Sequence, residues 1–161
     1  MLHTTLFTRD RGFREDVPPD EIDALAPSPA NLLWIDATAP TPEELKLLRQ
    51  ELKLHSLALE DLTHPSERAR IEQYDCLYAL VFYALCLAED GRLRMQPINI
   101  FLGPHFLLTV HREPIRVVDE VLRRWKENTE TMEPDVAPAA YSLLDTLVDD
   151  YFPVVDQIAE R

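Results

Sequence analysis

Four acidic side chains share one face of a helix that the last twenty residues predict. At about 100° of rotation per residue they fall within roughly 60° of one another: Asp145, Asp149, Asp156 and Glu160. Carboxylate oxygens are ligands of hard divalent cations, and Mg²⁺ needs only one or two of them because it keeps several waters. The pattern suits a cation site, but a plain solvated acidic face gives the same pattern and is the more common reason for it.

The same helix carries a separate apolar stripe, which predicts contact with the domain body or with a partner. The stripe consists of Leu144, Val148, Tyr151, Val155 and Ala159. Pro153 lies inside the helix and removes the hydrogen bond to the carbonyl of Asp149, so we expect a kink there.

The five histidines form no comparable cluster. His105 and His111 fall on one predicted strand, but six residues of strand separate them by about 20 Å, too far to share a zinc ion. His55 and His64 flank a short helix without a second ligand at helical spacing. Each histidine is therefore interpreted as solvated or satisfied within the core.

Other chemistry-bearing motifs are missing from the sequence. With only three glycines there is no P-loop or dinucleotide-binding fingerprint, and no nucleophile signature occurs. An enzyme that gathers carboxylates from distant positions is the alternative that the sequence leaves open.

The chain length and the net charge limit the kinds of partner that the protein can have. The 161 residues suit one domain, and the net charge of −13 argues against nucleic acid and anionic lipid as partners. Cations or basic proteins fit better. The longest apolar stretch, residues 78–88, is shorter than the ~18–20 residues that span a bilayer, and no signal peptide is visible. We expect a soluble chain in which Cys76 and Cys86 are reduced, buried thiols.

The elements that must position the acids can be read from periodicity and breakers. Strands are predicted at 2–7 and 31–37, and three long antiparallel strands between 70 and 113, the first of them central in the sheet. Helices are predicted at 41–54, with Thr41 as N-cap and Glu44 completing a capping box, and at 55–64, 115–127 and from about Pro138 onward. Helices flanking a mixed sheet, with a final helix leaving the body, follow from this order.

Three stretches resemble the soluble N-terminal domain of the CorA family of divalent-cation transporters. HSLALEDLTHPSERARIEQYD at 55–75 is similar to the family's H-P-L-x-L-E-D and R-P-K-x-E-x-Y segments, and FLGPHFLLTVHREP at 101–114 to its F-L-x-x-N-F-L-x-T-V-H strand pair. YSLLDTLVDDYFPVVDQI at 141–158 resembles its L-x-D-x-L-V-D-x-Y-F-P-x-L-D helix and is the most specific match. The resemblance runs from about Trp34 to Arg161. Departures stand at Ser56 and Ala69 in place of prolines, at Arg70 in place of lysine, and at His105 in place of asparagine.

The resemblance implies an α/β fold: an α/β/α sandwich with a central mixed, largely antiparallel sheet, residues 1–137, followed by the start of a long stalk helix, residues 138–161. The family's pore motif and two C-terminal membrane helices are not among these residues. We therefore expect a truncated cytoplasmic, ion-sensing domain of an inner (plasma) membrane magnesium/cobalt transporter, with membrane contact only through segments beyond Arg161.

The resemblance also implies a homopentameric, ion-gated channel that Mg²⁺ bound between subunits holds closed, with Co²⁺ or Zn²⁺ as other possible ions. The expected metal-binding residues are Asp145, Asp149, Asp150 and Asp156 on the stalk side, and Glu89 and Asp90 at a hairpin turn. The alternatives are the same domain of a ZntB-like zinc transporter, the carboxylate enzyme, and a soluble module for a basic partner.

Overall fold

The computed structural model describes residues 1–10, 12–63, 68–87 and 90–160. The strands are β1 (Leu2–Thr8), β2 (Gly12–Glu15), β3 (Asn31–Thr38), β4 (Arg70–Tyr74), β5 (Leu77–Leu87), β6 (Leu93–Leu102) and β7 (Phe106–His111). The helices are the short η1 (Pro19–Glu21) and α1 (Ile22–Leu25), then α2 (Pro42–Glu51), α3 (Ser56–Thr63), α4 (Arg116–Glu127), α5 (Val136–Asp149) and α6 (Tyr151–Ala159).

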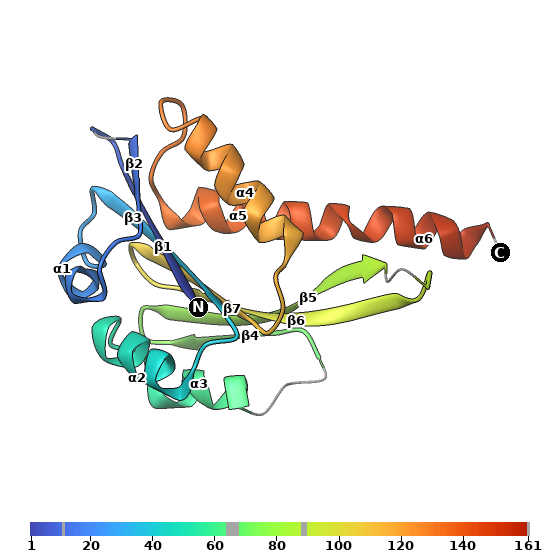
Figure 1. The fold of residues 1–161 in the computed structure, drawn as a ribbon, viewed down its shortest axis with the longest axis horizontal. Helices are drawn as coiled ribbons and strands as arrows, with labels where there is room; N and C mark the ends of the chain where they lie inside the picture. Colours follow the sequence, from blue (N-terminus) through green and yellow to red (C-terminus); the bar gives the residue numbers. More distant parts are fainter. Residues whose placement is uncertain (11, 64–67, 88–89, 161) are drawn as a thin grey trace.

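The seven strands form one mixed sheet in the order β2-β1-β3-β7-β6-β5-β4. Every neighbouring pair is antiparallel except β3 and β7, which run parallel at the centre. Helices cover both faces, with α1 to α3 on one side and α4 and α5 on the other (Figure 1). This is the α/β/α sandwich that the sequence predicts.

Each face of the sheet has its own hydrophobic core. Leu48 of α2 and Ala58 of α3 pack over Leu33, Ile35 and Leu108 on one face. On the other face, a wholly buried set from α4, α5, β3 and β6 packs together: Trp125, Val121, Leu143, Trp34 and Ile98. Strands β3 and β7 lie between the two cores, which is why almost every residue in them is buried.

The best-signposted helices form as predicted. Thr41 accepts a hydrogen bond from the Glu44 backbone while the Glu44 side chain accepts one from the Thr41 backbone, so the capping box is complete. In α4 the predicted apolar face is buried, from Ile115 to Trp125. Asp135 caps α5, which begins at Val136, two residues earlier than expected.

The prediction of three long strands between 70 and 113 was wrong, because the first of them is two strands. Asp75 has a positive φ of 51°, and Tyr74 pairs with Leu77 across a tight turn, so β4 and β5 form a hairpin. Cys76 lies at this turn and is exposed, contrary to the expectation of a buried thiol. The side chain of Cys86 lies outside the described residues.

The central strand was also misplaced. The centre of the sheet is β7, whereas β5 is second from the edge and leaves Tyr78 exposed. Apolar side chains on both faces show only that both faces of a strand are covered, not that the strand is central. The edge strand β2 escaped prediction because it has no buried residue and hence no alternating pattern.

The last two helices follow one another with a single intervening residue. Asp150 ends α5 and begins α6 with helical torsion angles (φ −66°, ψ −16°), three residues before Pro153. Figure 1 shows α6 continuing along the course of α5 and projecting beyond the sheet. The break near Pro153 is thus an interruption of the hydrogen-bond ladder at which the helix leaves the domain body.

Candidate functional site

An ion pair fixes the joint between α5 and α6. The guanidinium of Arg116, at the start of α4, donates to both carboxylate oxygens of Asp150 at 2.7 and 2.9 Å. Arg116 also pairs with Glu120. Desolvation opposes the charged form of the guanidinium, but Asp150 and Glu120 outweigh it and raise the pKa of Arg116. The carboxylate of Asp150 therefore already has a cationic partner within the chain.

Tyr151, the first residue of α6, provides a second attachment. Its hydroxyl donates to the backbone carbonyl of Tyr83 on β5 at 2.6 Å, and its ring packs edge-on against Phe82 with 6.1 Å between the centroids. Burial raises the pKa of the Tyr151 hydroxyl. The two contacts fix the point at which α6 departs from the sheet.

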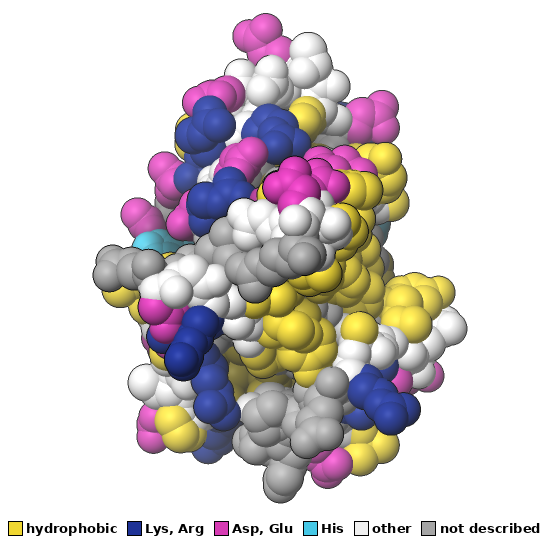
Figure 2. All heavy atoms as spheres, turned by 90° about the vertical axis from the view of Figure 1, so that its right-hand side faces the viewer, with side chains coloured by type: hydrophobic (Ala, Val, Ile, Leu, Met, Phe, Trp, Pro, Cys, Tyr) yellow, Lys and Arg dark blue, Asp and Glu magenta, His cyan; other side chains and the backbone are white. Residues whose placement is uncertain are grey.

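Beyond this joint α6 has no buried side chain. Its apolar residues Phe152, Val155 and Ile158 are 56–65% exposed. Figure 2 looks onto the end of the molecule from which α6 projects and shows a hydrophobic area with acidic side chains along its upper edge. The helix thus presents apolar and acidic side chains together on its exposed surface.

Three of the predicted stalk acids are free in this chain. Asp145, Asp149 and Asp156 are exposed, and no ion pair or hydrogen bond joins their carboxylates to other described residues. They contrast with Asp150, which Arg116 occupies. Their oxygens are chemically suited to Mg²⁺, which takes one or two carboxylates and completes its shell with water.

The predicted hairpin acids are separated from this helix in the sequence and have a local environment. Asp90 accepts a hydrogen bond from the Arg92 backbone at 3.0 Å and lies 3.7 Å from the Arg92 guanidinium. Its carboxylate therefore also has a cationic partner within the chain, Arg92. Glu89 lies outside the described residues.

Within the described ranges, no group of three or more His, Cys, Asp or Glu side chains is placed to hold a metal ion. The free acids follow one another along α5 and α6, so a second copy or water must supply the remaining ligands of any bound cation. No described helix is long and apolar enough to cross a membrane.

A buried polar network underlies α4 and α5, and the sequence reading did not single it out. Asp36 on β3 accepts hydrogen bonds from the Thr109 hydroxyl and from His111 Nε2, the latter at 2.8 Å. The Trp34 indole donates to Thr109 Oγ1 at 3.3 Å. His111 Nδ1 faces the backbone carbonyl of Glu113 at 2.7 Å.

Both nitrogens of the His111 ring therefore face acceptors, an arrangement complementary to a doubly protonated, cationic imidazole. Desolvation disfavours that charge, but the hydrogen bonds and the charge of Asp36 outweigh it and raise the pKa of His111. The interpretation of His111 as satisfied within the core is confirmed. His105 lies before β7 rather than on it, so the two histidines do not share a strand.

Residues 29–161 match the family model described as "CorA-like Mg2+ transporter protein". The chain belongs to this family. The CorA-like match begins just before β3 and includes the joint, α6 and the buried network. The ALR2 and CorA relatives described below are named as ion transporters rather than as enzymes, so the comparisons favour a transporter domain over the carboxylate enzyme.

Relatives in bacteria, yeast and archaea agree on this membership. YfjQ of Bacillus subtilis is 27% identical over all 161 residues, which span 49% of that protein. The magnesium transporter ALR2 of Saccharomyces cerevisiae is 24% identical over 78% of this chain and 15% of its own length. The cobalt/magnesium transport protein CorA of Methanocaldococcus jannaschii is 24% identical over 61% of this chain. The chain thus spans about half, or less, of these CorA-like relatives.

Solved structures share the fold at low sequence identity. Full-length CmaX has a TM-score of 0.79 at 18% identity and covers 98% of this chain. The soluble domain of M. jannaschii CorA has a TM-score of 0.70 at 16% identity. The ZntB cytoplasmic domain of Vibrio parahaemolyticus has a TM-score of 0.75 at 14% identity. The fold of this chain is therefore shared with CmaX, CorA and the ZntB cytoplasmic domain.

Sequence reasoning found the exposed acids but missed the groups that hold the helix in place. Arg116 pairs with Asp150 across 34 residues, and Asp36 pairs with His111 across 75. One signal for the second pair was available: Trp34 and Asp36 on β3, and Thr109 and His111 on β7, are polar or amphipathic residues two apart in otherwise apolar strands, so each pair lies on one face of its strand.

Proposed function

We propose that this chain is the soluble regulatory domain of a CorA-like magnesium/cobalt transporter, and that free carboxylates on α5 and α6 sense the cytosolic divalent ion. The observation that carries the proposal is the exposed, unpaired state of Asp145, Asp149 and Asp156 beside a helix held at its base and free beyond it. Membership of the family and the likeness to CorA soluble domains support it.

The mechanism is electrostatic and depends on assembly. In a homopentamer the stalk helices of neighbouring copies would bring like-charged faces together, and each chain carries a net charge of −13. Carboxylates that share a divalent cation lose their mutual repulsion, so abundant Mg²⁺ favours the closed assembly. When the ion is scarce, the acidic faces repel, the stalks separate and the pore opens.

The six predicted acids are not equivalent in this proposal. Asp145, Asp149 and Asp156 are the primary ligands. Asp150 must first release Arg116 to bind an ion, so it contributes mainly to the joint. Glu89 and Asp90 are secondary candidates, and Asp90 must likewise leave Arg92. The same proposal includes three further points: a cytoplasmic location, membrane attachment through segments beyond Arg161, and residues 138–161 as the start of the stalk.

The test uses the full-length transporter and protection from proteolysis with and without Mg²⁺. The triple variant Asp145→Asn, Asp149→Asn, Asp156→Asn should lose the protection that Mg²⁺ gives against proteolysis. It should also continue to transport ions at Mg²⁺ concentrations that close the parent protein. A matched control, Asp10→Asn, Asp20→Asn, Glu130→Gln, removes the same charge from exposed positions away from α5 and α6 and should behave like the parent. Unchanged Mg²⁺ dependence in the first variant would refute these ligands.

The fold is also compatible with zinc, in place of magnesium, as the transported ion. The ZntB cytoplasmic domain matches this chain about as well as the CorA domain does, so a ZntB-like zinc transporter is the alternative. Uptake of Mg²⁺, Co²⁺ and Zn²⁺ by cells that express the full-length protein distinguishes the two. Zinc uptake without magnesium uptake would reject the magnesium proposal and leave the regulatory one to be tested with Zn²⁺.

A further inference from the structure

A cavity of about 300 Å³ opens beside the carboxyl ends of the two parallel strands. Ala39 and Pro40 follow the end of β3. His111 is the last residue of β7, and Arg112 follows it. From there the chain turns to opposite faces, to α2 after β3 and to α4 after β7 (Figure 1). Ligands of open α/β sheets bind where neighbouring connections diverge in this way.

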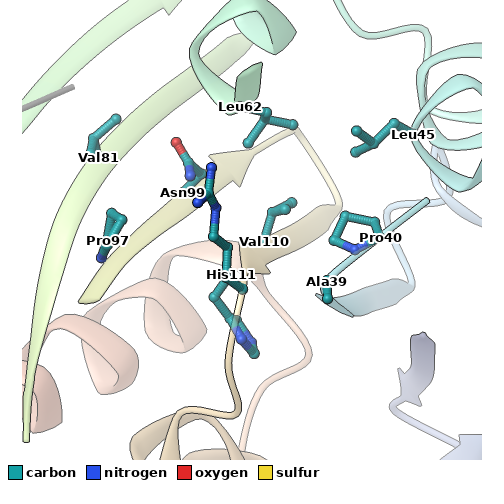
Figure 3. A pocket seen from close by; sticks show the side chains of 10 residues that line it. Ala39, Pro40, Leu45, Leu62, Val81, Pro97, Asn99, Val110 and His111 are labelled. Atoms are coloured by element: carbon teal, nitrogen blue, oxygen red, sulfur yellow. The ribbon is translucent and has the colours of Figure 1, made fainter. Parts of the chain in front are cut away.

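The walls of this cavity are mostly apolar. Leu45 of α2 and Leu62 of α3 form the helix side, and Val81 and Val110 form the sheet side, as Figure 3 shows. The volume is at the lower end of the range for small-molecule sites, about 300–1,000 Å³. The cavity can therefore take a compact ligand with a short branched or ring-shaped apolar part.

One polar side chain interrupts the sheet side. In the register of the strands Asn99 lies between Val81 on β5 and Val110 on β7, so it faces the same layer as these two valines. Its amide, partly buried, makes no hydrogen bond with another described residue. Figure 3 shows the amide pointing into the space beneath Leu62, while the His111 ring points away from it.

Arg112 contributes a guanidinium to the lining of the cavity. Its side chain is exposed, forms no ion pair or hydrogen bond within the described part of the chain, and meets no acidic residue among the described lining. The arginines of α4 show the contrast, since Arg116, Arg123 and Arg124 all pair with glutamates. A free guanidinium and a free amide beside apolar walls match an anion that also carries an apolar part.

We propose that this cavity binds a small organic carboxylate, with Arg112 and Asn99 donating to the carboxylate and the leucine and valine walls enclosing the apolar part. A guanidinium can donate two parallel hydrogen bonds to one carboxylate, and the Asn99 amide supplies a further donor. The proposal does not rest on ion sensing by α5 and α6, because the cavity lies on the opposite side of the sheet from α5.

The test titrates the ¹⁵N-labelled 161-residue chain with 3-methylbutanoate and, separately, with its neutral isostere 3-methylbutanamide. The carboxylate should produce saturable amide shifts around Asn99 and Arg112, whereas the isostere should bind at least about tenfold more weakly. Absence of saturable shifts at these residues, or equal binding of the two compounds, would overturn the proposal.

Variants separate charge from shape. Arg112→Gln should weaken carboxylate binding about tenfold or more, and Asn99→Leu should weaken it while keeping the cavity apolar. Arg49→Gln removes an exposed, unpaired arginine from α2 outside the cavity and should leave affinity within about twofold of the parent. Binding that survives Arg112→Gln, or that falls equally in Arg49→Gln, would show that Arg112 does not hold the carboxylate.

Discussion

Helices α5 and α6 have similar composition and run end to end, but they meet different surroundings. α5 buries six side chains, among them Ala139, Leu143 and Leu147, against the core that also contains Trp34 and Trp125. α6 buries none and exposes Phe152, Val155 and Ile158. An apolar stripe therefore shows that a helix needs a partner, and the fold decides whether the same chain supplies that partner.

The charged groups beneath α5 and those along α5 and α6 also differ in their surroundings: the first are buried and paired, and the second are exposed. Asp36 and His111 are buried beneath α4 and α5 and satisfy one another, because an unpaired charge there would be costly. Asp145, Asp149 and Asp156 are solvated and remain free to bind something else. Stability should therefore depend on the first set and assembly on the second.

The largest expected effect comes from truncating a core residue of α5. Leu143→Ala should lower the free energy of unfolding by about 2–5 kcal/mol, because it removes buried methyl groups and leaves a cavity. Phe152→Ala on α6 should change it by less than about 0.5 kcal/mol in this chain. Urea denaturation measures both. Equal losses would show that α6 packs against the body in solution.

The buried pair should make stability depend on pH. Because the folded state raises the pKa of His111 above its unfolded value of about 6.5, the stabilisation is complete below that pH and is lost as pH rises through the folded pKa. The free energy of unfolding should thus fall on the alkaline side of pH 6.5. His111→Gln should flatten this part of the profile, and His105→Gln should leave it in place.

A flat profile in the parent chain between pH 6 and 9 would contradict a cationic His111. An NMR titration of the imidazole provides a second measurement that is independent of the stability of the variant. In the parent chain the His111 ring should remain protonated to higher pH than a model imidazole.

A smaller effect is expected at the joint. Tyr151→Phe removes the hydrogen bond to the Tyr83 carbonyl and should cost about 0.5–1.5 kcal/mol. In this variant, amide hydrogen exchange should accelerate more in α6 than in α5 relative to the parent chain, because only α6 loses an attachment to the sheet. Tyr141→Phe on the exposed face of α5 is the control and should change neither quantity.

The smallest effect is expected from the free acids. Asp149→Asn should change the free energy of unfolding by less than about 0.5 kcal/mol, with a slight gain because it reduces the net charge of −13. Asp150→Asn should cost more, up to about 1 kcal/mol, because it weakens the pair with Arg116. Thermal unfolding at low salt compares the two. A larger loss from Asp149→Asn would mean that its carboxylate has a structural role.

Local signals in the sequence predicted most of the elements. The capping box at Thr41, the apolar face of α4 and the breakers around β3 act within a few residues, and periodicity detects them. The hairpin between β4 and β5 was missed because Asp75 reaches a positive φ without a glycine to signal it. The central place of β7 was missed because pairing order depends on residues far apart in the chain.

The candidate site was predictable in part for the same reason. The acids of α5 and α6 lie at helical spacing, so the sequence predicts that they share one side of a helix, and the structure shows that Asp145, Asp149 and Asp156 are exposed. The sequence could not show that Arg116 engages Asp150 and leaves Asp149 free, because that choice depends on how α4 packs against α5. Nor could it show that Asn99 and Arg112 meet at one cavity, because strand register brings them together.

The parallel pair of β3 and β7 also constrains the order of folding. Asp36 and Thr109 are neighbours in the sheet but 73 residues apart in the chain. During synthesis the strongly apolar β3 therefore emerges long before its central partner, and long-range pairing of this kind is slow. Until β7 leaves the ribosome, β3 has an open edge towards the position of β7, and we expect this interval to be the time at which the chain is most prone to aggregation or most dependent on a chaperone.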